Sequence, residues 1–190
     1  TKLRVRKTRT RTVSTLHLGP FQAREVFLFC NACAHTQRSE ELAALVPPSA
    51  NFGYDVMVYA GKALWQRHRT EEEVVAELAQ ENVQISPREV SWLGMRFVVY
   101  LALAHQRCAP AIKADMQTRG GYICHLDATC EGGDPFLMSS IDSLSKTVLG
   151  NVKLPAEDKA HIVPFLNRIK EAFGTPLALV HDMGQGILAA

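Results

Sequence analysis

The sequence predicts a mixed α and β fold, of the α+β or α/β class, in three consecutive regions. Three observations support this prediction. Residues 11–33 alternate as the arms of a β-hairpin do, and residues 54–105 carry apolar side chains at helical spacing. Residues 120–182 are typical of three strands, a helix and a fourth strand. We therefore expect regions at 1–38, 39–118 and 119–190.

Composition favours a folded chain, because 47% of the 190 residues are hydrophobic. The longest apolar run, 97–104, is too short for a transmembrane helix. The polar, basic N-terminus does not resemble a secretory signal. We therefore expect a cytoplasmic protein that does not bind membranes. Because the chain begins at Thr1 and stops at Ala190, where a helix would begin, we expect it to be a piece of a longer protein.

Basic residues dominate the start of the chain, and no acid precedes Glu25. A basic arm of this kind attracts polyanions such as DNA, although a solvated tail is the simpler alternative. The DNA-binding residues expected in this arm are Lys2, Arg4, Arg6, Lys7, Arg9 and Arg11.

The predicted hairpin has arms at 12–18 and 21–29, joined by a turn at Gly19 and Pro20. Its second arm leads to a Cys-x-x-Cys motif, Cys30 and Cys33, whose thiolates suit two positions of a tetrahedral Zn²⁺ site. No second pair with this spacing follows, so a complete zinc ribbon would need one before Thr1. Free thiols or a redox pair are the alternatives.

Three helices are expected in the middle region, the first over 54–68. The second opens with a capping box of Thr70 and Glu73, and the third opens with Ser86 and Glu89 around a proline. The short link between the last two is typical of a helix-turn-helix unit, whereas a helical spacer is the alternative. As the recognition helix, the third would present to DNA Arg88, Ser91, Trp92 and Arg96.

Two carboxylates end two of the expected strands, Asp127 in the first and Asp182 in the fourth. A right-handed crossover through a helix at 158–173 places the fourth strand parallel beside the first, so that the two acids face each other. Carboxylates so placed bind Mg²⁺ or Mn²⁺, and two such ions support phosphoryl transfer. We therefore expect Asp127 and Asp182 to be catalytic and metal-binding. The alternative for either one is a cap or turn role.

Other titratable residues lie near these acids. Asp134 and Asp142 are typical of turns, and Glu131 is close enough to Asp127 to support it. His125 and His181 could orient the acids or contact phosphate, although packed strand histidines are commoner.

A family resemblance follows from four stretches of the second half: Gly120-Gly-Tyr-Ile-Cys-His-Leu-Asp-Ala-Thr-Cys-Glu-Gly-Gly-Asp, Asp142-Ser-Leu-Ser, Val148-Leu-Gly-Asn-Val-Lys-Leu-Pro and Val180-His-Asp-Met-Gly. They resemble bacterial DDE-type insertion-sequence transposases, which have a ribonuclease H-like core. The first half is similar to the zinc-ribbon and helix-turn-helix regions that precede this core. The resemblance thus implies a zinc-ribbon-like hairpin, a helix-turn-helix middle and a partial ribonuclease H-like βββαβ core.

The resemblance also implies a function. Members nick transposon ends and join the freed 3′-hydroxyl to target DNA, using Mg²⁺ and acting as homo-oligomers, so the chain would be nucleoid-associated. Of the three family acids, Asp127 matches the first and Asp182 the second, while the third is absent here. We therefore expect the parent protein to be an enzyme and this chain to be inactive. The alternatives are a non-catalytic DNA-binding protein derived from a transposase, or a ribonuclease H-like nuclease or resolvase.

Overall fold

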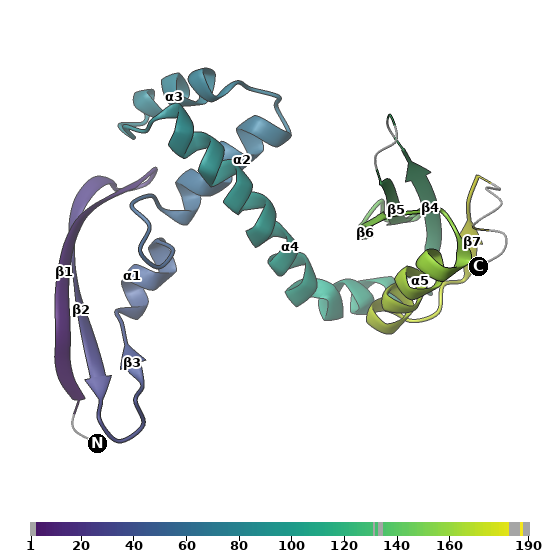
Figure 1. Ribbon diagram of the computed structural model, residues 1–190, viewed down its shortest axis with the longest axis horizontal. Helices are drawn as coiled ribbons and strands as arrows, with labels where there is room; N and C mark the ends of the chain where they lie inside the picture. The colour runs from purple at the N-terminus through teal and green to yellow at the C-terminus, as the bar shows by residue number, and fades with distance from the viewer. Residues whose placement is uncertain (1–2, 131, 133–134, 183–186, 188–190) are drawn as a thin grey trace. The chain divides into compact units, whose positions relative to one another are not determined.

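A computed structural model describes residues 3–130, 132, 135–182 and 187 of the chain. It confirms the mixed α and β class, with helices and two β-sheets (Figure 1). The chain divides into two compact units, Thr1–Leu103 and Ala104–Ala190.

The first unit begins with an antiparallel sheet in the order β1-β2-β3, and helices follow it. Its elements are β1 (Leu3–Thr15), β2 (Gly19–Cys30), β3 (Thr36–Gln37), α1 (Glu40–Leu45), α2 (Tyr54–Trp65), α3 (Glu71–Gln80) and the first half of α4 (Pro87–Thr118).

Strand β1 is longer than the predicted arm of the hairpin. Residues 3–11, expected as a basic arm, pair with β2 from Leu3 opposite Cys30 onward. The physical reason lies in the alternation of threonine with basic residues, because β-branched Thr8, Thr10 and Thr12 favour an extended chain. A strand with polar side chains on both faces lacks the apolar alternation by which sequence analysis finds strands. The basic residues from Arg4 to Arg11 therefore belong to a folded strand and not to a tail.

A small core holds the hairpin against the segment that follows it. Val13 of β1 and Ala23 of β2, which lie on the same face of the hairpin, pack with Val46 and Ala50. The turn of the hairpin is fixed as well, because the Leu16 N–H donates to Asp55 Oδ2 at 2.8 Å. The hairpin and the start of α2 thus form one body.

The helices of the first unit begin where the sequence predicts. Both capping boxes are present: Glu73 accepts from the Thr70 N–H at 2.9 Å, and Glu89 accepts from the Ser86 N–H at 3.1 Å. Helix α2 ends at Trp65 and not at His68. The buried residues that join the three helices come from each of them, including Val56 and Ala60 of α2, Val74 and Leu78 of α3, and Val90, Leu93 and Phe97 of α4.

Gly61 allows α2 and α4 to approach closely. A Cβ added at Gly61 would lie 2.1 Å from the Phe97 ring, which is buried in this core. We expect Gly61→Ala to lower the free energy of unfolding of this unit by about 1–3 kcal/mol, because the overpacking exceeds the gain in helix propensity. Urea unfolding followed by the fluorescence of Trp65 and Trp92 measures this change. The exposed neighbour Lys62→Ala is the control, and a stable Gly61→Ala variant would contradict the close packing.

The second unit contains a mixed sheet in the order β6-β5-β4-β7, with β7 parallel to β4. Its elements are the end of α4, β4 (Ile123–Thr129), β5 (Phe136–Asp142), β6 (Val148–Leu154), α5 (Lys159–Phe173) and β7 (Ala178–Val180). Asp158 caps α5 by accepting from the His161 N–H at 3.1 Å. The predicted order of three strands, a helix and a fourth strand parallel beside the first is confirmed.

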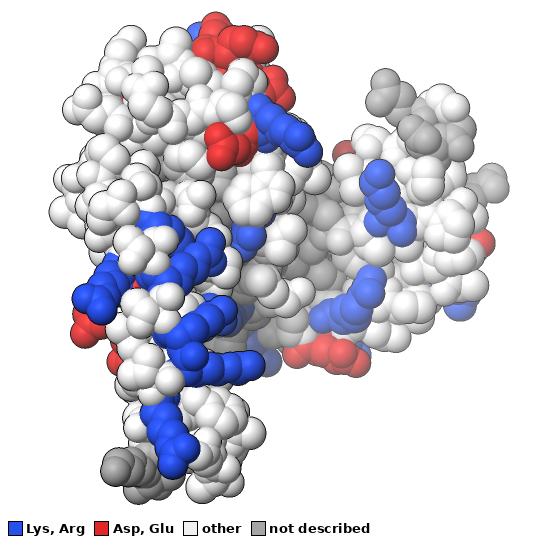
Figure 2. Space-filling view, turned by 60° about the vertical axis from the view of Figure 1, so that its left-hand side comes forward, with Lys and Arg blue, Asp and Glu red and all other residues white. Residues whose placement is uncertain are grey.

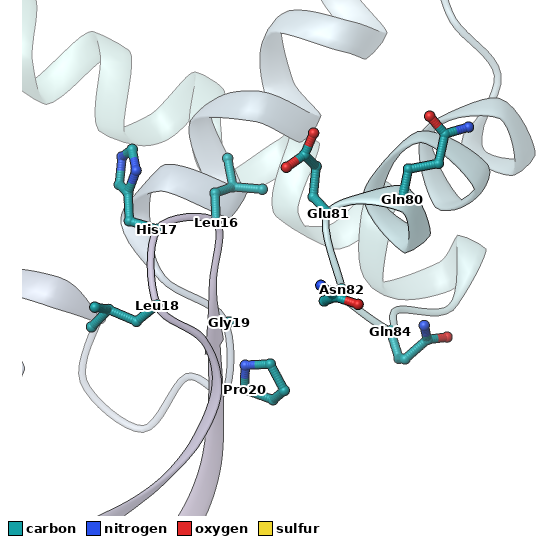
Figure 3. A pocket seen from close by; sticks show the side chains of 9 residues that line it. All are labelled: Leu16, His17, Leu18, Gly19, Pro20, Gln80, Glu81, Asn82 and Gln84. Atoms are coloured by element: carbon teal, nitrogen blue, oxygen red, sulfur yellow. The ribbon is translucent and has the colours of Figure 1, made fainter.

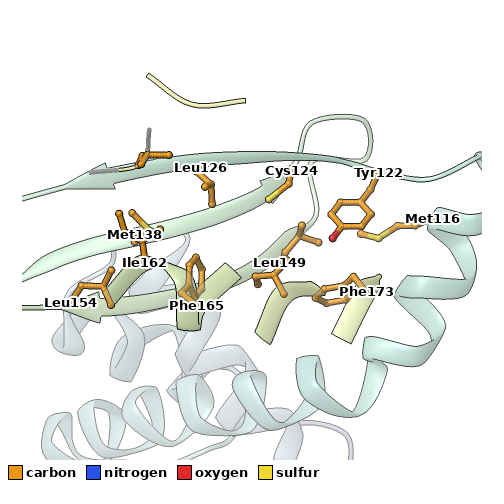
Figure 4. Close-up of a cluster of buried hydrophobic side chains, with 12 residues drawn as sticks. Met116, Tyr122, Cys124, Leu126, Met138, Leu149, Leu154, Ile162, Phe165 and Phe173 are labelled. Carbon is orange, nitrogen blue, oxygen red and sulfur yellow. The ribbon is translucent and has the colours of Figure 1, made fainter. Parts of the chain in front are cut away.

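One face of this sheet packs on α5. Tyr122, Cys124 and Leu126 point into the core, where they meet buried side chains of α5 such as Ile162 and Phe165 (Figure 4). Met116 of α4 is also buried there, so the core of this unit includes helical residues that precede position 119. The alternate residues of β4 lie on the opposite face of the sheet.

None of the helices in the described part of the chain combines the length and the apolar character needed to cross a membrane.

Candidate functional site

The two predicted catalytic acids belong to adjacent parallel segments. Strand β7 pairs with β4 through Ile123 with Ala178, Cys124 with Leu179 and His125 with Val180. The same offset of 55 positions separates Asp127 from Asp182, each two residues beyond the last of these pairs. The pairing in the structure ends at Val180, and two further residues in the same register would bring Asp127 and Asp182 to the same level of neighbouring chains, where adjacent strands lie about 4.8 Å apart.

Asp127 lies on the face of the sheet that α5 does not cover. In β4, Cys124 and Leu126 are buried, whereas His125, Asp127 and Thr129 are exposed. Asp182 is exposed too, two residues after the end of β7. On the other side of β4, Asp127 pairs with Ser139 of β5. An exposed strand-end carboxylate can reach a hydrated cation at little desolvation cost.

The structure separates Asp142 from this pair. Its carboxylate is fully buried and accepts from the N–H groups of Ile123, Leu144 and Ser145 at 3.1–3.2 Å. The Ser145 hydroxyl donates to it at 2.6 Å. Burial favours the neutral acid, but these hydrogen bonds outweigh it and hold the pKa of Asp142 below its usual value. Asp142 is thus the turn residue that the sequence predicts, and it joins the β5–β6 turn to the start of β4.

The remaining acids and histidines near the pair are placed only in part. Glu131 and Asp134 lie outside the described residues. His125 is exposed on the same face as Asp127, whereas His181, one position from Asp182, is half-buried. By the alternation of β4, His125 shares a face with Asp127.

Cys30 and Cys33 form a tight turn between β2 and β3. Cys30 is buried and Cys33 is exposed, and the loop is closed by the Cys30 N–H, which donates to the His35 carbonyl at 2.9 Å. The Cys33 thiol, and then the backbone N–H groups of Cys33 and Ala32, hydrogen-bond the Cys30 sulfur and lower its pKa. N–H groups directed at a sulfur stabilise a thiolate, which is the form that binds metals.

No group of three or more Cys, His, Asp or Glu side chains is placed to hold a metal ion among the residues that the structure describes. The donor sets seen here are pairs. Two soft thiols at Cys30 and Cys33 fit part of a Zn²⁺ site, and two carboxylates at Asp127 and Asp182 fit hard ions such as Mg²⁺ or Mn²⁺.

The predicted DNA-binding residues of the N-terminus differ in exposure. Arg4, Arg6, Lys7 and Arg9 are exposed on β1, and Lys2 lies outside the described residues. Arg11 is only 8% exposed, and its Nε and Nη1 atoms have no hydrogen-bond partner among the described residues. Burial lowers its pKa, although the nearby Glu25 carboxylate raises it. Arg11 therefore differs from the other four, because it belongs to the interior of the hairpin region.

The predicted recognition helix presents three of its four candidate residues to solvent. Arg88, Ser91 and Trp92 are exposed on α4. Arg96 is half-buried, with its guanidinium 4.7 Å from the Trp92 ring and 5.6 Å from the Tyr100 ring. It also donates to the Tyr100 hydroxyl at 3.3 Å. These contacts give Arg96 a packing role that the sequence did not indicate.

A shallow cavity of about 650 Å³ opens between the hairpin turn and the link from α3 to α4 (Figure 3). Its lining is mainly polar and includes His17, Gln80, Glu81, Asn82 and Gln84. None of the predicted site residues lines it.

No protein-family model and no curated protein matches this chain.

Proposed function

We propose that this chain is part of a DDE-type DNA transposase whose core binds divalent metal through Asp127 and Asp182. The observation that carries the proposal is the parallel pairing of β4 with β7, whose offset of 55 positions is also the offset between Asp127 and Asp182. The order β6-β5-β4-β7, with α5 as the crossover, is the arrangement expected of a ribonuclease H-like core. By the family resemblance, Asp127 and Asp182 are the first two of three acids, and the complete protein acts on DNA as a homo-oligomer.

Mg²⁺ or Mn²⁺ bound there would activate the attacking oxygen and stabilise the leaving oxygen of a phosphodiester. The chain's own contribution is two exposed carboxylates: Asp127 within β4, on the face of the sheet away from α5, and Asp182 two residues after β7. Without the third acid, the chain is expected to bind metal and DNA but not to cut DNA.

The test uses the purified 190-residue chain. Calorimetric titration with Mn²⁺ should show binding, and fluorescence anisotropy should show binding to a labelled duplex in the presence of EDTA. A chain that binds duplex DNA but no Mn²⁺ would instead support the alternative, a non-catalytic DNA-binding protein derived from a transposase. A chain that binds neither would overturn both functions.

Within this proposal, Cys30 and Cys33 supply half of a zinc ribbon, and α3 with α4 forms the helix-turn-helix unit. The hydrogen bonds that Cys33 and Ala32 make to the Cys30 sulfur support the first assignment, because they stabilise the thiolate that binds a metal ion. The short link at 81–86 and the exposed N-terminal turn of α4 support the second.

Arg88→Ala tests the recognition helix. Arg88 is exposed in the first turn of α4, where such helices contact DNA. We expect its removal to weaken duplex binding about tenfold, or ~1.4 kcal/mol, and to flatten the salt dependence. Arg96→Ala should change the affinity for duplex DNA little, because the Arg96 guanidinium is already in contact with the rings of Trp92 and Tyr100. Lys62→Ala, which removes an equal charge from α2, is the control, and anisotropy titrations measure the duplex affinity of each variant. Equal affinities of Arg88→Ala and Lys62→Ala would contradict the assignment of α4 as the recognition helix.

A further inference from the structure

An irregularity in β1 collects basic residues on one face of the hairpin. Residues paired directly across an antiparallel ladder share a face. Lys7 pairs with Phe27 and Arg9 with Glu25, so these four lie on one face. Strict alternation would place Arg4 on the other face.

The register shifts between Val5 and Lys7, where Arg6 is the extra residue of a β-bulge. Arg4 is consequently paired with Phe29, on the same face as Phe27. The bulge therefore adds two cations to the face that carries Lys7 and Arg9. In the view of Figure 2, Lys and Arg side chains gather on one part of the surface, with few acidic side chains among them.

Three cations of this region lie over aromatic rings. Arg6 lies 5.6 Å from the centre of the Phe29 ring, and Lys7 lies 4.7 Å from that of Phe27. Arg38, which follows β3, lies 5.0 Å from the same Phe27 ring. Sequence analysis did not single out Arg38, since its link to the hairpin depends on the β2–β3 pairing. We call Arg4, Arg6, Lys7, Arg9 and Arg38 the basic face.

The opposite face of the same strands is different in character. Its described residues include Thr8, Thr10, Thr12 and Val26, and its single charged residue in the described parts of β1 and β2 is Arg24. Substitutions of basic residues on the two faces of the β1–β2 hairpin can therefore be compared with each other.

We propose that the basic face binds the phosphate backbone of double-stranded DNA without reading its base sequence. This inference rests on the proposed function, because the proposed function is the reason for taking DNA as the polyanion. Phosphate is favoured over unpaired bases because Phe27 is only 5% exposed and the cations occupy its ring. A stacking platform for single strands needs free aromatic rings. An anionic membrane is disfavoured because Phe27 is buried and Phe29 is half-buried, and both rings are in contact with cations, so that neither is free to insert.

Binding to the phosphate backbone predicts how the affinity changes with salt concentration. Each phosphate neutralised on a duplex contributes about −0.9 to the slope of log K against log salt concentration. Backbone contacts carry no sequence information, so the loss on mutation should be the same on unrelated duplexes.

The experiment measures anisotropy of two unrelated labelled duplexes, in EDTA and over a series of salt concentrations, with the whole chain. The Arg6→Ala/Arg9→Ala variant should reduce the slope by about 1.8 on both duplexes, whereas Arg24→Ala should leave it unchanged. Deletion of Arg6 also removes the bulge and turns Arg4 to the other face, so it should reduce the slope more than Arg6→Ala alone. Circular dichroism of each variant verifies that the hairpin is folded.

Each contrary outcome has a distinct meaning. Duplex binding by the wild-type chain that is unaffected by the Arg6→Ala/Arg9→Ala change would overturn this inference and leave the proposed function standing. Unequal losses on the two duplexes would show base reading and overturn it as well. Tighter binding to a single strand of the same length, or to phosphatidylserine vesicles, with the same dependence on Arg6 and Arg9, would assign the face to that ligand instead. Absence of DNA binding by the wild-type chain would end both proposals.

Discussion

Asp127→Asn is expected to weaken Mn²⁺ binding by about tenfold, or ~1.4 kcal/mol, while duplex DNA binding in EDTA stays unchanged. The amide keeps the size of the side chain but loses the negative charge that attracts the cation. Because Asp127 is exposed and lies on the face opposite the buried core, the substitution should not alter folding. Calorimetric titration with Mn²⁺ measures the effect directly.

The same titration with Asp182→Asn and with the double variant tests whether the two acids share one ion. If they do, the loss in the double variant should be smaller than the sum of the two single losses. Glu171→Gln is the matched control, because it removes one exposed carboxylate from α5 away from the strand ends. Wild-type Mn²⁺ affinity in Asp127→Asn would contradict the assignment of the metal site and, with it, of phosphoryl-transfer chemistry.

The order of elements in the second unit could be predicted because its signals are local. The alternation in β4, the Asp158 cap and the amphipathic pattern of α5 each depend on residues close in sequence. The parallel placement of β7 beside β4 then follows from the handedness of crossover connections. The candidate acids were found in the same way, as polar ends of apolar strands.

The features that sequence analysis missed depend on partners far along the chain. The bulge at Arg6 is defined only by the register with β2, and the position of Arg38 only by the pairing of β3. The burial of Arg11 likewise follows from the packing of the hairpin against the segment after it. The unequal roles of the N-terminal basic residues are therefore a consequence of tertiary structure, and composition alone treats them as equivalent.

Asp142→Ala is expected to destabilise the second unit by about 3–5 kcal/mol, the largest effect on stability that the structure indicates. The change would leave the N–H groups of Ile123, Leu144 and Ser145 without their acceptor at a buried position. Because both tryptophans lie in the first unit, hydrogen exchange of β4 and β5 peptides, measured by mass spectrometry, is the suitable readout. Arg119 lies 3.5 Å from the Asp142 carboxylate and 2.6 Å from that of Asp115. Asp115→Ala is therefore the control, because the Asp115 carboxylate is exposed and its loss should cost less than about 1 kcal/mol.

The pH dependence of this unit follows from the same carboxylate. The pKa of Asp142 is lower in the folded chain than in the unfolded chain, so the unfolded state binds the proton more readily. The stabilisation is therefore fully present above the unfolded pKa, about 3.9, and is lost as the pH falls through the folded value. Exchange protection of β4 should thus decrease in acid for the wild type, whereas Asp142→Asn, already less stable, should show a smaller decrease. If protection in Asp142→Asn falls as steeply as in the wild type, another group controls the acid transition, and Asp142 is not the residue that couples this sheet to pH.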